Sequence, residues 1–166
     1  YVTSMIFSGE QPDRGEDNPK GPCQVAFSKS VDGGKTFPDA SSPKILADSE
    51  GSAPRLEAPI VAGGQSNSVL TCWYHSENPN FPDSFDIKCK TSKDGGKTFS
   101  NEITVVDDRN EVPYWKCPDQ SYHRVFPAMA PSIEITPNGV AHMVYSADPT
   151  SGDSDGECGY IYYAKS

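Results

Sequence analysis

The chain has 166 residues and a mass of 18.0 kDa, which is the size of one domain or of part of one. Its 23 acidic and 14 basic residues give a net charge of −9, so binding to nucleic acid or to an anionic membrane surface is not expected. The longest apolar runs are only a few residues long, and no membrane-spanning segment is expected.

Short strand-like runs separated by turn residues follow one another along the chain. The 14 Gly and 15 Pro residues cluster between runs rich in Val, Ile, Tyr and Phe, a composition typical of short strands and tight turns. In chain order, strands are expected over 2–7, 25–29, 44–47, 57–62, 69–74, 87–91, 103–106, 129–134, 140–145 and 161–165.

Two turn segments are nearly identical. Ser30–Phe37 reads SVDGGKTF and Ser92–Phe99 reads SKDGGKTF, and each directly follows an expected strand. The last expected strand leads into Ser166, which stands where a third copy of the motif would begin. The strands before these turns also align with one another, so the repeating unit is four strands, A to D, with the Asp-Gly-Gly turn between C and D.

The motif S-x-D-x-G-x-T-F resembles the Asp-box, or bacterial neuraminidase repeat, and the likeness covers nearly the whole chain. The resemblance implies an all-β fold: a β-propeller of four-stranded antiparallel blades joined through Asp-box turns. About two and a half blades would be present. Residues 1–50 would supply strands B to D of one blade, 53–107 a complete blade, 107–127 a long D–A connection, and 128–166 strands A to C.

A closed propeller needs roughly four to eight blades. Either the chain is an internal part of a larger propeller of about six blades, or several copies assemble to close the ring. The first alternative is favoured because both ends of the sequence cut through a blade.

The box residues are expected to be structural rather than catalytic. Glycine permits backbone angles that a side chain would forbid in a tight turn, and an Asp carboxylate can accept hydrogen bonds from nearby turn amides. The aromatic residue of each box is expected to anchor the turn to its blade. The residues assigned to this role are Ser30, Asp32, Gly34, Thr36, Phe37, Ser92, Asp94, Gly96, Thr98 and Phe99.

Ligand binding is expected on the face opposite the boxes. The strand order places the short A–B and C–D turns at one face and the long B–C and D–A loops at the other, where function generally lies. The candidates for contact with a glycan or a protein are Arg55, Trp115, Tyr122 and Arg124, because aromatic faces beside polar groups suit such ligands. The alternative is that Trp115 and Tyr122 fill the space between blades.

Two classes of function fit the resemblance. The first is a binding or architectural module whose partners are a glycan or protein, the rest of the propeller, or other subunits. The alternative is a fragment of a sialidase-type exo-glycoside hydrolase. That chemistry needs an arginine cluster and a Tyr/Glu pair, and the chain has only four arginines and no assignable pair. No catalytic residue is therefore assigned.

The five cysteines form no CxxC motif, which excludes zinc-ribbon and thioredoxin-like sites. Counting outward from each B–C loop pairs Met5 with Phe27, Met143 with Tyr163, and Cys72 with Cys89. Opposed strand residues are close enough for a disulfide, so a Cys72–Cys89 bond is expected. A second bond between Cys117 and Cys158 is a weaker hypothesis, which leaves Cys23 free or paired elsewhere. This cysteine content indicates a secreted, periplasmic or cell-surface protein.

An acidic segment near the C-terminus has the oxygen ligands that calcium prefers. Asp148, Asp153, Asp155 and Glu157 lie within ten residues, but their spacing does not match an EF-hand. A solvated acidic loop is the favoured interpretation, and no cofactor is assigned, with calcium as the alternative.

Overall fold

The computed structural model describes residues 1–7, 23–49, 55–76, 86–107, 115–116, 122–123, 125–127, 131–149 and 160–166. Within these residues the fold is all-β, as expected, and every strand pairing is antiparallel. The helical residues there form two short 3-10 turns, Pro38–Ser41 (η1) and Gln65–Asn67 (η2). No helix in this part of the chain is long and apolar enough to cross a membrane.

The strands form three larger sheets and one small ribbon. The first sheet contains β1 (Val2–Phe7), β2 (Cys23–Ser28) and β3 (Lys44–Asp48). The second contains β4 (Arg55–Gly63), β5 (Val69–Ser76), β6 (Asp86–Ser92) and β7 (Ile103–Val106). The third contains β10 (Val125–Pro127), β11 (Ser132–Ile135), β12 (Ala141–Pro149) and β13 (Tyr160–Lys165). The ribbon pairs β8 (Trp115–Lys116) with β9 (Tyr122–His123).

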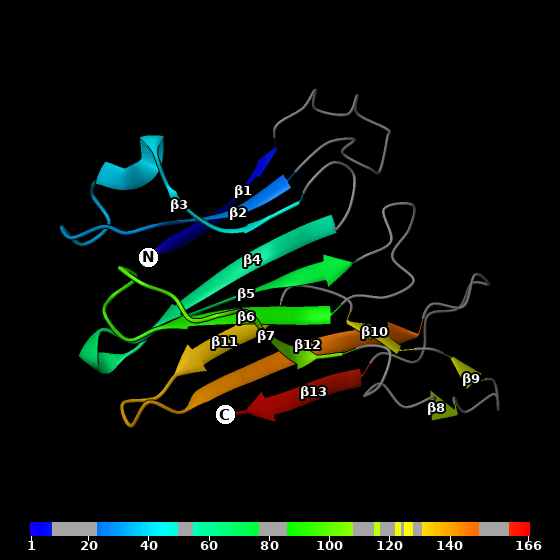
Figure 1. Ribbon diagram of the computed structural model, residues 1–166. Helices are drawn as coiled ribbons and strands as arrows, with labels where there is room; N and C mark the ends of the chain where they lie inside the picture. The colour runs from blue at the N-terminus through cyan, green and yellow to red at the C-terminus, as the bar shows by residue number, and fades with distance from the viewer. Residues whose placement is uncertain are drawn as a thin grey trace.

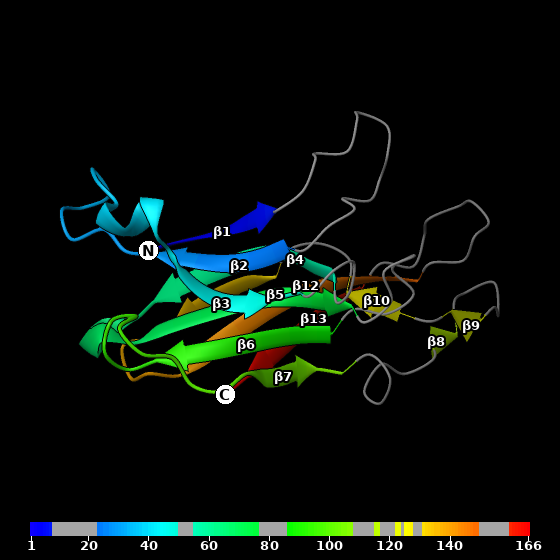
Figure 2. The same cartoon turned by 45° about the horizontal axis from the view of Figure 1, so that its top comes forward.

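The three larger sheets lie one after another in chain order (Figures 1 and 2). Strand β4 contacts β1 of the first sheet and β11 of the third, so the second sheet is covered on both faces. This explains why β5, with the sequence VLTCWYHS, lacks polar alternation, since all of its residues are buried.

Successive side chains of β5 enter two different cores because they point to opposite faces of the sheet. Val69 and Trp73 pack with β2 residues of the first sheet, whereas Leu70 and Cys72 belong to a cluster that includes Met143 of the third sheet. Each large apolar side chain that is fully buried in this way contributes roughly 1.5–3 kcal/mol of transfer free energy. The stacked arrangement is therefore held by apolar layers between the sheets.

The first strand of both the second and the third sheet is irregular. In β4 the register with β5 shifts between Glu57 and Ile60, where Ala58 has a φ of 45°. In the third sheet β10 and β11 both pair with β12, whereas a single strand was expected over 129–134. A bulge or break at this position lets the strand change register along its neighbour.

The hairpin registers confirm one predicted cross-strand pair and correct two. Cys72 lies opposite Cys89, as predicted. Phe27 lies opposite Thr3 rather than Met5, and Tyr163 lies opposite Val144 rather than Met143. The prediction assumed that paired residues lie equally far along the two strands from the expected loop ends. The registers of the first and third hairpins are shifted from that expectation by two residues and by one residue.

Candidate functional site

The two Asp-box turns lie at the same end of the stacked sheets (Figure 1). The turn between β4 and β5 lies at the same end (Figure 1). The backbone N–H of Gly95, in the second box, donates a 2.8 Å hydrogen bond to the carbonyl of Asn67 in that turn. The expected grouping of the short turns at one end is therefore found for this part of the chain.

In each box the Asp carboxylate accepts hydrogen bonds from donors of the same turn. In the first box, the Ser30 hydroxyl donates to Asp32 Oδ1 at 2.6 Å, and the Thr36 hydroxyl donates to Asp32 Oδ2 at 2.6 Å. The backbone N–H groups of Lys35 and Thr36 donate to Oδ1, and that of Gly34 donates to the Ser30 hydroxyl. The carboxylate is thus surrounded by donors from its own turn.

The second box repeats this network with nearly the same distances. Ser92 and Thr98 donate their hydroxyls to Asp94 at 2.8 and 2.6 Å, and the Thr98 and Gly96 backbone N–H groups donate inside the turn. The pKa of Asp94 is lowered well below its ordinary range, chiefly by the Thr98 hydroxyl, and that of Asp32 is lowered chiefly by the Ser30 hydroxyl. Both carboxylates therefore remain ionised, and neither is tuned for general acid catalysis.

The two boxes differ in what they pack against. Phe99 of the second box packs edge-on against Phe27 of the first sheet, with ring centroids 5.1 Å apart. The Lys44 ammonium lies 5.9 Å above the Phe99 ring and donates to the carbonyl of Lys97. Phe37 of the first box, by contrast, makes no ring contact within the described residues. The second box therefore joins two sheets, as well as turning the chain.

Glycine is required twice in each turn. Gly96 has a φ of 86°, in the left-handed region, and a Cβ there would lie 2.5 Å from the Phe27 ring. Gly34 has a φ of 87°, but a Cβ there would meet nothing within 4 Å. Gly33 and Gly95 share the positive φ. The structural role predicted for Gly34 and Gly96 is consistent with these angles.

Three of the four candidate ligand residues have backbone positions toward the opposite end of the sheets. Arg55 begins β4 and lies opposite Ser76, where the chain leaves β5 for its long connection to β6. Trp115 and Tyr122 lie in the ribbon, whose register pairs Trp115 with His123 and Lys116 with Tyr122 (Figure 1). The side chains of Arg55, Trp115 and Tyr122, and all of Arg124, lie outside the described part of the chain.

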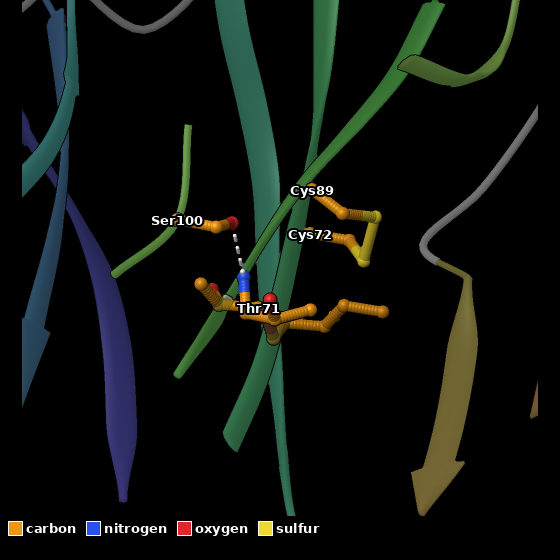
Figure 3. The surroundings of a disulfide bond; sticks show 6 residues. Thr71, Cys72, Cys89 and Ser100 are labelled. Atoms are coloured by element: carbon orange, nitrogen blue, oxygen red, sulfur yellow. Dashed lines mark hydrogen bonds between the residues drawn. A yellow bond between two sulfur atoms is a disulfide. The ribbon is translucent and has the colours of Figure 1, made fainter. Parts of the chain in front are cut away.

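The predicted disulfide is present. Cys72 and Cys89 are fully buried, their sulfurs are 2.10 Å apart, and the bond projects from the second sheet toward β11 (Figure 3). Ser100 lies on the other side of the sheet, where its hydroxyl accepts a hydrogen bond from the backbone N–H of Thr91. Cys23 is a buried free thiol, whereas Cys117 and Cys158 lie outside the described residues.

A groove between the second and third sheets was missed by sequence reasoning. It has a volume of about 320 Å³, and Cys89 of the disulfide forms part of its wall. The repeat contained a signal for this groove. Phe27 and Cys89 occupy the same position before the two boxes, so an aromatic residue in the first sheet is replaced by a smaller one in the second.

Within the ranges that the structure covers, no group of three or more His, Cys, Asp or Glu side chains could hold a metal ion. Asp153, Asp155 and Glu157 fall outside those ranges, and Asp148 is described only as a backbone position in β12. Comparison of the chain with protein-family models found no matching family, and comparison with curated proteins found no significant match.

Proposed function

We propose that the chain is a binding module, a segment of an Asp-box β-propeller that recognises a glycan or a protein through the end opposite its boxes. The observation that carries this proposal is the internal use of the box carboxylates. Asp32 and Asp94 accept hydrogen bonds from their own turns, so the most distinctive motif of the sequence serves folding. Recognition is then left to the other end of the sheets.

The sheet repeat supports the propeller part of the proposal. Three antiparallel sheets stack in chain order: the first has three strands, the second has four, and in the third β10 and β11 both pair with β12. The first and the second sheet each contain one box between their last two strands. Propeller blades are four-stranded antiparallel sheets of this kind. Under this proposal, the remaining blades come from further chain or from other subunits.

The ligand class follows from charge and residue type. A net charge of −9 favours a neutral glycan or a basic protein surface over an anionic partner. Trp115 and Tyr122 provide aromatic faces on which a sugar ring or an apolar side chain can stack. The disulfide is compatible with an oxidising compartment, so we propose a secreted, periplasmic or cell-surface location.

A glycan array followed by titration tests the proposal. Trp115→Ala is expected to weaken binding of the best glycan at least tenfold, whereas Lys97→Ala, in the second box, leaves it unchanged. Equal losses in the two variants would contradict the assignment of the binding face. Turnover of a fluorogenic sialoside by the chain would instead support the hydrolase alternative.

A further inference from the structure

We infer that the groove between the second and third sheets is a docking site for a further Asp-box segment. In this complex the segment's aromatic ring enters the groove, and the strand after its turn pairs with β13. The inference rests on the internal symmetry of the described sheets and does not depend on the ligand-binding face proposed above.

The groove is lined by both apolar and polar residues. Its apolar lining comes from both sheets: Leu70, Cys89, Ile103, Val105, Met143 and Ala164. Lys93 and Lys165 also line it. A volume of about 320 Å³ lies at the lower end of the range of ligand cavities, roughly 300–1,000 Å³. The site therefore suits a single large apolar group.

The equivalent place between the first and second sheets holds Phe99. Phe27 and Lys44, which contact that ring, are paired across β2 and β3. Cys89 and Ile103, which line the groove, are paired in the same way across β6 and β7. The residues that line the groove thus correspond by register to those that hold an aromatic ring one sheet earlier.

A third pair of equivalent residues extends the correspondence. Leu46 and Val105 both lie at the register shift of their edge strand, and Leu46 packs in the cluster that Phe99 covers. Leu46 is 4% exposed, whereas its counterpart Val105 at the open groove is only half-buried. Ile103, the counterpart of Lys44, is 50% exposed. An aromatic ring in the groove would bury Ile103 and Val105 as Phe99 buries the first sheet.

The edge of the third sheet supplies the second half of the site. In the first two sheets, the strand that follows the box, β3 or β7, pairs with the strand before it. Among the described residues, β13 pairs only with β12, so its other edge has no neighbouring strand there. A peptide can add to such an edge through backbone hydrogen bonds.

These features identify the occupant as a separate segment rather than a second copy of the described sheets. Both boxes of this chain are followed by strands that already pair within their own sheets, so neither strand is available to β13. The occupant is therefore an Asp-box turn with a terminal aromatic residue and a following strand that is free to pair.

A synthetic peptide with the sequence of residues 92–106, SKDGGKTFSNEITVV, tests this inference on the intact chain. Calorimetric titration is expected to show saturable binding, and replacing the peptide's Phe by Ala is expected to weaken it at least tenfold. In the protein, Ile103→Asp places a carboxylate in the groove and is expected to weaken binding at least tenfold. Ile45→Asp is the matched control, because Ile45 is 41% exposed on β3 and lies outside the groove.

An NMR measurement keeps the inference testable if Ile103→Asp does not fold. Intermolecular contacts are expected between the peptide's Phe ring and the methyl groups of Ile103 and Met143 in the unmodified protein. The inference is overturned by equal binding of the Phe and Ala peptides, or by the absence of saturable binding at millimolar peptide. It is also overturned by a protein dimer that covers Ile103 and that the peptide does not dissociate.

Discussion

Removing the Cys72–Cys89 bond is expected to lower the free energy of unfolding by about 3 kcal/mol. The bond closes a loop with a sequence separation of 17 residues, and the chain-entropy relation gives about 3 kcal/mol for a loop of that length. In a domain of this size, a loss of about 3 kcal/mol corresponds to a fall of roughly 6–12 °C in Tm. Both sulfurs are buried, so Cys72→Ala/Cys89→Ala also loses some packing.

Urea unfolding, followed by circular dichroism with and without a reductant, measures this effect. The unmodified chain is expected to lose stability when reductant is added, whereas the double variant starts less stable and changes little. Cys23, Cys117 and Cys158 are retained in both proteins, so any reductant effect left in the variant reports on other bonds. Equal stability of the two oxidised proteins would refute the reasoning.

Two further predictions concern the boxes. Gly96→Ala is expected to destabilise the fold more than Gly34→Ala, because both residues have positive φ but only at Gly96 would a Cβ meet the Phe27 ring. Backbone strain alone costs roughly 1–2 kcal/mol, and equal melting temperatures for the two variants would argue against the inter-sheet contact. The lowered pKa values of Asp32 and Asp94 mean that their contribution to stability is complete above the unfolded pKa of about 3.9 and is lost as the pH falls toward the folded values. Asn at both positions is expected to reduce this acid dependence in urea titrations between pH 2 and pH 6, and an unchanged slope would contradict it.

The motif predicted the C strands and the box turns well because their chemistry is local. Ser, Asp, Gly and Thr at fixed spacing complete a network within eight residues, so distant contacts are not needed to recognise it. The hairpin registers depend on long connections, whose lengths the pattern does not constrain. In the first hairpin the error was two residues, which keeps the same face and cannot be detected from alternation.

The third hairpin shows the other kind of error. A shift of one residue exchanges the faces of a strand, and the structure turns Met143 toward the second sheet and leaves Val144 exposed. Alternation in AHMVYS allows either face to be buried. Only the presence of the second sheet decides between them, which is why the pairing of Met143 with Ala164 was not predicted from sequence.

The second box is part of the second sheet in sequence, but its Phe99 packs in the core of the first sheet. The first sheet therefore depends on the turn of the second sheet, whereas the second sheet has no such dependence on the first turn within the described residues. Opening of the turn that ends at Phe99 uncovers Phe27 and Leu46 of the first sheet, while the first sheet's own turn covers nothing comparable in the described part of the chain. Amide hydrogens of β2 and β3 should therefore exchange faster when the second turn is weakened. Weakening the first turn should leave exchange in β5 and β6 unchanged.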